Sequence, residues 1–330
     1  MSRQVKPVHW SSPKYVLLLF LVCCWPAIWS SSGGAATISK QLSPNPEDLT
    51  TVRQRRTVVK RCDATQRSEY GGFGSQFQNI IQAAVYAEWH KKHFCVNPLT
   101  AVDHNYDNRD TFLREVNAIA TLDLPRLPPQ LYYCLFVQSC PTIDVTLEFI
   151  ENKKRWFDEF IEEKEHADFA KQHLRKIGKD LKKSLATVPG KYAAVHVRRL
   201  NSLDYRPGFD QRILDSRTYC QAMRQVEAEH PGIRFVVHSQ GTFEDFDIFS
   251  SEPRISLHLN KTLNSTFVEM VSADVLLVSH SSLSYSAGLL SQGEIWGPDS
   301  FWHSFPYYWK TFESKKMIEL GEPCLLPISR

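Results

Sequence analysis

The stretch YAAVHVRR, residues Tyr192 to Arg199, sets the architecture expected of this chain. Its apolar run predicts a buried β-strand, but the run is followed by two adjacent arginines instead of a turn residue. Two full cations beside a buried strand need a negative partner, because an unpaired buried charge is costly. We therefore expect Arg198 and Arg199 to bind either a carboxylate of the protein, such as Asp204 or Asp215, or an anionic ligand.

Strand and helix patterns alternate along the chain after Lys191. Strands are expected at 192–197, 233–239, 274–279 and 294–297, and helices at 217–230, 265–273 and 282–293. The dipeptide Pro231-Gly232 ends the first of these helices. This alternation predicts a doubly wound parallel α/β sheet in a C-terminal domain, residues 186–330.

The preceding segment, residues 57–185, has a similar character. A possible strand at 57–62 is followed by a glycine loop, an apolar helical stripe and a short run at 94–98 that resembles a strand. This order predicts a βαβ unit and a second Rossmann-like domain on the acceptor side. The charged segment 151–183 keeps apolar residues at helical spacing, so it predicts a surface helix that joins the two domains.

The N-terminal residues carry signals for the secretory pathway. The apolar run 15–29 follows a basic stretch and is shorter than the ~20 residues that span an average bilayer. It predicts either a cleaved signal peptide or a signal-anchor with residues 1–14 as a cytosolic tail and the bulk in the lumen. Residues 30–56 are expected to form a flexible stem. The RQRR sequence that closes the stem is either a processing site or a solvated basic patch.

Two further patterns agree with a lumenal address. Asn260 and Asn264 each begin an N-glycosylation sequon. Outside the apolar run, the cysteines are even in number and allow three disulfides of open connectivity: Cys62, Cys95, Cys134, Cys140, Cys220 and Cys324. We expect a single-pass type II membrane protein of the Golgi or endoplasmic reticulum, or else a secreted protein. The formal net charge of +3 is too balanced for a nucleic-acid partner.

Polar clusters follow three of the expected strands, and ligands bind at the carboxyl ends of such strands. The clusters are His196 to Arg199, His238 to Gln240, and Ser279 to Ser284, the last of which opens a helix. Arginine forks, hydroxyl groups and the N–H groups of a helix start all suit a diphosphate. The competing interpretation is structural, with the arginines in ion pairs and the serines as a helix cap.

Three motifs carry a resemblance to a known superfamily: GGFGSQ (Gly71–Gln76), HVRR (His196–Arg199), and SHSSLS (Ser279–Ser284) preceded by ADVLL. In order and spacing they resemble the GDP-fucose-dependent fucosyltransferases, which comprise α1,2-, α1,6- and protein O-fucosyltransferases. The resemblance covers about residues 57–300. It implies a GT-B-like pair of Rossmann-type domains and an inverting reaction that uses GDP-fucose as donor without a metal or other cofactor.

The resemblance also implies roles for individual residues. Arg198 would hold the diphosphate, and the other donor-binding residues would be Gly72, Phe73, Gly74, His196, Arg199, Ser239, Ser281 and Ser282. Asn201 and Gln240 stand where members of the superfamily often have aspartate. Either Asp204 replaces the first of these in catalysis, or that role is absent. The catalytic base stays open among Asp204, Asp210 and His238.

The expected function is therefore fucosyl transfer to a glycan or glycoprotein. The alternatives are a transferase that uses another GDP-sugar and a non-catalytic, secreted glycan-binding module.

Overall fold

The computed structural model describes residues 62–66, 71–102, 109–120, 148–150, 153–184, 188–199, 213–250 and 252–325. The chain divides into two compact units, Met1–Arg56 and Thr57–Arg330, and all of these residues belong to the second unit. The predicted cytosolic tail, apolar segment and stem, residues 1–56, lie outside the described residues. Within the described ranges, no helix is both long and apolar enough to cross a membrane.

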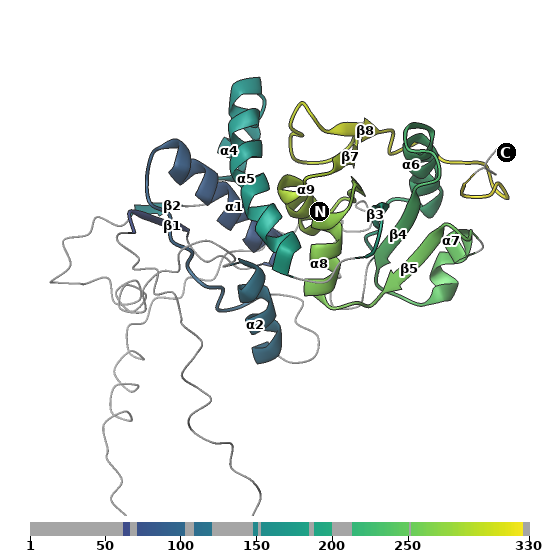
Figure 1. The fold of residues 1–330 in the computed structure, drawn as a ribbon, viewed down its shortest axis with the longest axis horizontal. Helices are drawn as coiled ribbons and strands as arrows, with labels where there is room; N and C mark the ends of the chain where they lie inside the picture. Colours follow the sequence, from purple (N-terminus) through teal and green to yellow (C-terminus); the bar gives the residue numbers. More distant parts are fainter. Residues whose placement is uncertain are drawn as a thin grey trace, which may run out of the picture. The chain divides into compact units, whose positions relative to one another are not determined.

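A parallel sheet forms the C-terminal half of the described chain (Figure 1). Its strands are β3 (Tyr192–His196), β4 (Arg234–Ser239), β5 (Ile255–Leu259), β6 (Val275–Leu277), β7 (Glu294–Pro298) and β8 (Lys310–Phe312). They lie in the order β5-β4-β3-β6-β7-β8, and each neighbouring pair is parallel. The order reverses between β3 and β6, which is the switch point where doubly wound sheets bind their ligands. The predicted α/β class with parallel sheets is confirmed.

Helices cover both faces of this sheet. Successive strand residues point to opposite faces, so Ala194 and Val236 belong to one core, while Val195 and Val237 belong to the other. The first core also takes side chains from helices of the N-terminal half. The helices of the C-terminal half are α6 (Ser216–Glu229), α7 (Asp247–Ser250), α8 (Leu263–Ser272) and α9 (Ser282–Leu290).

Helix α6 confirms the helix predicted at 217–230. Asp215 caps it by accepting a hydrogen bond from the backbone N–H of Arg217, and the helix ends just before Pro231. Strands β5 and β8 and helix α7 were not predicted from the sequence. Both strands lie at an edge of the sheet, and β8 has only three residues, so neither gives a long apolar run. The sequence of β5, ISLHL, alternates because its apolar side chains pack on one core, while its polar side chains lie on the opposite face.

The N-terminal half contains the predicted glycine loop and helix, with less sheet than expected among the described residues. Strand β1 (Ala64–Gln66) pairs in parallel with β2 (Glu148–Ile150), and α1 (Phe73–Trp89) confirms the predicted helical stripe. Strand β1 begins after the predicted strand, of which 57–61 lie outside the described residues. The run at 94–98 contributes an isolated parallel bridge between Ala64 and Phe94. Among the described residues, the other helix before β2 is α2 (Arg109–Ala120).

The charged segment 151–183 forms two helices instead of the one that was predicted. Helix α4 (Lys154–Phe160) ends at Ile161, and α5 (Lys164–Ser184) follows after a short turn. Ile161 is almost fully buried, and the ring of Phe160 stacks on His166 with centroids 4.4 Å apart. The turn between the two helices therefore lies beside buried apolar side chains of the core.

Both halves of the described chain share one core. Phe77 of α1 packs edge-to-face on Phe267 of α8, with ring centroids 5.3 Å apart. At Gly178 of α5, an added Cβ would lie 1.9 Å from the carbonyl oxygen of Leu290, at the end of α9. Helices α5 and α9 approach so closely that position 178 has no room for a side chain. The core therefore runs across the predicted domain boundary at 185.

Two disulfides occur among the described residues. Cys62 pairs with Cys95, and Cys220 pairs with Cys324. The remaining two predicted participants, Cys134 and Cys140, lie outside the described ranges. The second bond fastens the C-terminal segment to α6, where Arg224 also donates hydrogen bonds to the backbone carbonyls of Pro323 and Cys324.

Candidate functional site

A buried hydrogen bond spans the switch point of the sheet. It joins Nδ1 of His196, the last residue of β3, to Oγ of Ser279, which follows β6, at 2.7 Å. Burial and, secondarily, the charge of Arg198 lower the pKa of His196 to about 3. The imidazole is therefore neutral at physiological pH. His196 holds the two strand ends together and adds no positive charge to the site.

The serine motif forms the beginning of α9. The hydroxyl of Ser281 caps this helix by accepting from the backbone N–H of Leu283 at 3.3 Å. The hydroxyl of Ser284 accepts from the N–H of Ser279 at 3.2 Å. Ser282 is the first helical residue and is partly exposed. The capping interpretation is thus right for Ser281, and the same geometry leaves a helix N-terminus, which favours an anion, at the ligand edge of the sheet.

The glycine motif lies directly against this helix start. At Gly74 an added Cβ would lie 2.4 Å from the backbone nitrogen of Leu283, so only glycine allows the approach. The hydroxyl of Ser286 donates to the carbonyl oxygen of Gly74 at 3.3 Å. Gly72 is the N-cap of α1, so the beginnings of α1 and α9 meet. Two motifs separated by about two hundred residues are thereby brought to one place.

Phe73 lies within the glycine motif, but its side chain belongs to the core. The ring is 3% exposed, stacks on Phe77 and packs edge-to-face on Phe267. Its predicted contact with the donor can therefore be made only through its backbone. The ring instead anchors the first turn of α1, which holds Gly72 and Gly74 in position.

Arg198 follows β3 at the switch point and is partly buried. Its charge is close enough to His196 to contribute to that residue's lowered pKa. The buried hydroxyl of Tyr219 lies beneath the same edge: burial raises its pKa, and contacts with the Ser279 side chain and the Arg198 backbone oppose the rise. Tyr219 was not among the predicted site residues. Its position in the apolar stripe of α6 gives no sign that its hydroxyl reaches the strand ends.

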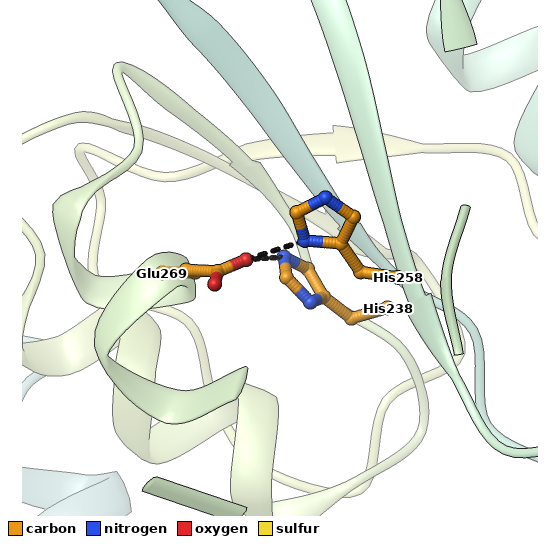
Figure 2. Close-up of side chains that lie close together, drawn as sticks. All are labelled: His238, His258 and Glu269. Carbon is orange, nitrogen blue, oxygen red and sulfur yellow. Dashed lines mark hydrogen bonds and ion pairs between the residues drawn. The ribbon is translucent and has the colours of Figure 1, made fainter. Parts of the chain in front are cut away.

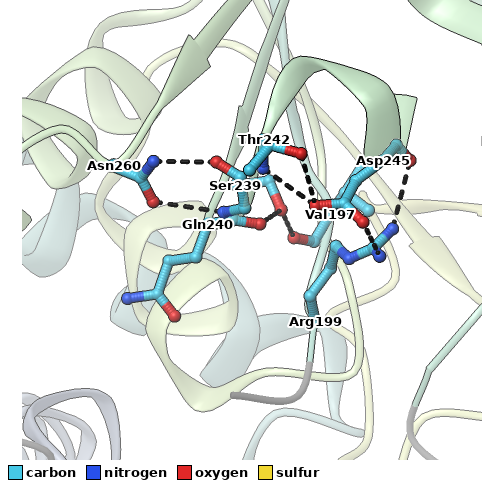
Figure 3. A network of polar contacts seen from close by, with 8 residues as sticks. Val197, Arg199, Ser239, Gln240, Thr242, Asp245 and Asn260 are labelled. Atoms are coloured by element: carbon cyan, nitrogen blue, oxygen red, sulfur yellow. Dashed lines mark hydrogen bonds and ion pairs between the residues drawn. The ribbon is translucent and has the colours of Figure 1, made fainter. Parts of the chain in front are cut away.

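Arg199 has a protein partner. Its Nη2 lies 2.8 Å from Oδ1 of Asp245, and its Nη1 donates to the Asp245 carbonyl oxygen at 3.2 Å (Figure 3). Its guanidinium also lies over the ring of Phe246. The structural interpretation is right for this arginine, although the partner is neither of the two aspartates considered. Asp215 instead caps α6. A supporting donor contact by Arg199 stays a prediction.

Ser239 connects the ends of β3 and β4. Its hydroxyl lies 2.7 Å from the carbonyl oxygen of Val197 and donates to it (Figure 3). Because Val197 immediately precedes Arg198, this bond fixes the point at which the arginines leave the sheet. The structure thus gives Ser239 a positioning role, and its direct contact with the donor stays a prediction.

Of the three candidate catalytic bases, only His238 lies among the described residues. Asp204 and Asp210 lie outside the described residues. His238 is completely buried, and burial lowers its pKa to about 3, so it cannot contact an acceptor hydroxyl in this conformation.

The chain also contains an Asp-x-Asp sequence, Asp245-Phe246-Asp247. Asp245 is already held by Arg199 and by the backbone N–H of Thr242, so this sequence does not present a ready pair of metal ligands.

No model of a known protein family matches the chain, and no curated protein matches it. Three similar solved structures are the Escherichia coli heptosyltransferase WaaC with ADP-2-deoxy-2-fluoro heptose, a variant of Arabidopsis thaliana FUT1 in complex with GDP, and the fucosyltransferase NodZ from Bradyrhizobium. WaaC is 8% identical over 75% of this chain and 91% of its own, with a TM-score of 0.41. FUT1 is 9% identical over 72% and 70%, with a TM-score of 0.37. NodZ is 10% identical over 70% and 94%, with a TM-score of 0.32. Fucosyltransferases are thus among the solved structures that this chain resembles in fold.

Proposed function

We propose that this protein is a glycosyltransferase that moves fucose from GDP-fucose to a hydroxyl of a glycan or glycoprotein, with inversion at the anomeric carbon. The observation that carries the proposal is the meeting of three motifs at the switch point of the sheet. The Gly74 backbone lies against the start of α9, and Ser279, just before that start, is bonded to His196. Arg198 follows directly on the same strand end.

This arrangement suits a reaction in which negative charge develops on a leaving diphosphate. Arg198 would hold phosphate oxygens with its planar fork, and the N–H groups at the starts of α1 and α9 would add donors. Such groups are fixed before the reaction begins, so they stabilise the developing charge without reorganisation. The acceptor hydroxyl would attack from the face opposite the diphosphate, and the residue that takes its proton is not assigned.

A donor panel tests the proposal. The full chain is incubated with GDP-fucose, other GDP-sugars or UDP-sugars, with and without a mixed glycan acceptor, and released nucleoside diphosphate and glycosylated product are measured. We expect turnover with GDP-fucose above all others. Preference for another GDP-sugar would replace fucose in the proposal, and glycan binding without any turnover would favour a non-catalytic binding module.

The same assay tests whether the chemistry needs a divalent metal. We expect transfer at 25 °C to continue in EDTA, because an arginine and two helix starts can neutralise a diphosphate. A loss of activity that Mn²⁺ restores would contradict this expectation. Asp247→Asn is the matched variant: if the Asp-x-Asp sequence held a catalytic metal, this change would abolish the restoration.

We also propose that the protein enters the secretory pathway, as a type II membrane protein of the Golgi or endoplasmic reticulum or as a secreted protein. The basic flank before the apolar segment, the sequons and the two disulfides support this.

Glycan occupancy tests the secretory proposal. Asn260 is exposed, whereas Asn264 is half-buried in α8 with its Oδ1 buried. A folded chain can accommodate a glycan more readily on the exposed residue. We expect Asn260→Gln to remove the mobility shift that an N-glycan-cleaving enzyme produces, and Asn264→Gln to preserve it. A wild-type protein from eukaryotic cells that shows no shift would count against a lumenal address.

A further inference from the structure

A second cluster of chemically active side chains lies on the same sheet, beginning one strand away from His196, whose register partner on β4 is His238. His238 and His258 occupy matching register positions on the parallel strands β4 and β5. Their side chains point to the same face of the sheet, and the carboxylate of Glu269 on α8 faces both imidazoles (Figure 2). Nδ1 of His258 lies 2.7 Å from Oε2 of Glu269, and Nε2 of His238 lies 3.7 Å from the same oxygen.

The carboxylate is oriented by groups behind it. The hydroxyl of Ser265 donates to Oε1 of Glu269 at 2.9 Å, and the hydroxyl of Tyr192 donates to the backbone carbonyl oxygen of Glu269 at 2.7 Å. One carboxylate oxygen is therefore occupied, and the other faces the two imidazoles. Hydrogen bonds that fix one oxygen of a carboxylate in this way are typical of the outer shell of metal sites.

His238 gives the independent sign that something is to be bound here. Its side chain is completely buried, and neither ring nitrogen has a hydrogen-bond partner among the described residues. A buried polar group without a partner is destabilising by about 1–3 kcal/mol. A ligand that accepts an imidazole lone pair would remove this cost at Nε2, the nitrogen that faces Glu269.

We propose that His238 Nε2, His258 Nδ1 and Glu269 Oε2 bind one zinc ion. These three atoms lie within 4.8 Å of one another, while a tetrahedral zinc with bonds of about 2.0–2.1 Å places its donor atoms about 3.4 Å apart. Small side-chain shifts close this difference. Two imidazoles and one carboxylate form a ligand set that zinc favours over Mg²⁺ or Ca²⁺, which prefer oxygen alone.

The proposed ion has an access route and a structural effect. His258 is 25% exposed at the edge of the sheet, so the ion can enter from solvent and keep water as its fourth ligand. Bound zinc would fasten the edge strand β5 to β4 and to α8. It acts on the architecture and not on the leaving diphosphate, so the expected EDTA resistance of transfer at 25 °C stands beside it.

Another cluster of the same residue types provides the matched control. Glu229, His230 and Glu294 also lie close together. There the ammonium group of Lys310 already lies between the two carboxylates and is ion-paired with both. This cluster has its cation in the protein itself, so we expect it to bind no metal.

Zinc titration of the untagged, chelator-treated full chain against a chromophoric chelator tests the proposal without any donor sugar. We expect one zinc per chain and a rise in the thermal midpoint on binding. Both His258→Gln and Glu269→Gln should abolish tight binding, and Ser265→Ala should weaken it about 10–100-fold. His230→Gln should bind zinc as the wild type does.

His258→Gln is the decisive variant, because its edge position and partial exposure allow substitution without loss of fold, which circular dichroism verifies. Co²⁺ should give the visible spectrum of a tetrahedral site in the wild type and not in this variant. The proposal is overturned if the wild type binds no stoichiometric zinc, if folded His258→Gln keeps wild-type affinity, or if His230→Gln loses affinity equally.

Discussion

Replacing Arg198 with lysine is expected to lower kcat by about 10²–10³-fold while leaving the fold intact. Lysine keeps the positive charge but presents it as a point instead of a planar fork, so two phosphate oxygens can no longer be held together. Loss of one charged donor to a developing anion corresponds to roughly 3–4 kcal/mol of transition-state stabilisation. The neutral His196 beside it cannot supply the missing donor charge. Turnover with GDP-fucose and thermal unfolding, measured on the same preparation, check the result.

Arg199→Lys is the matched control for this experiment. The guanidinium of Arg199 is bonded to Asp245, half-exposed and next to Phe246. Lysine can keep the ion pair, and exposed pairs contribute only about 0–1 kcal/mol, so we expect a small effect on kcat. Equal losses in the two variants, or an Arg198→Lys enzyme that keeps most of its activity, would refute the assignment of Arg198 to the diphosphate.

Removing the disulfide between Cys220 and Cys324 is expected to produce the largest loss of stability. The bond closes a loop with a sequence separation of 104 residues, and the chain-entropy relation gives about 4.7 kcal/mol for a loop of that length. The C-terminal segment would then be attached to α6 chiefly by the hydrogen bonds and ion pair of Arg224. Denaturant unfolding of the Cys220→Ala/Cys324→Ala variant measures the change.

The disulfide between Cys62 and Cys95 closes a shorter loop and provides a comparison for the expected loss of stability. Cys62 and Cys95 are 33 residues apart in sequence, for which the same relation gives about 3.7 kcal/mol. The Cys62→Ala/Cys95→Ala variant should therefore lose less. A larger loss for the shorter loop would show that packing around Cys62, and not loop closure, determines the stability that these bonds contribute.

The interior of the sheet was predictable because its strands carry a continuous apolar signal. Runs such as YAAVH and RFVVHS are buried on both faces, and each helix between them has a cap or a stop in the sequence. The meeting of His196 with Ser279 was predictable for the same reason: parallel strands bring their carboxyl ends to one edge, whatever their separation in sequence.

The parts that sequence reasoning missed depend on edges and on neighbours far along the chain. Strand β5 has apolar side chains on one face only, so its alternating pattern was missed, and with it the placement of His258 beside His238. The signal was available, since histidine is the second residue from the end in both β4 and β5. The partner of Arg199 lies 46 residues away in a 3-10 turn, and no local pattern indicates it.

The contact at Gly74 also bears on how this protein could be recombined with others of the same fold. Gly74 and the Ser282–Leu283 backbone that it contacts lie far apart in the sequence of the folded unit. A side chain at position 74 would clash with that backbone, so neither segment can change without the other. A chimera that exchanges residues 57–185 for those of another transferase must bring a glycine to position 74 or reshape the start of α9. The two segments depend on each other sterically, although a gene fusion designed on linear domain boundaries would separate them.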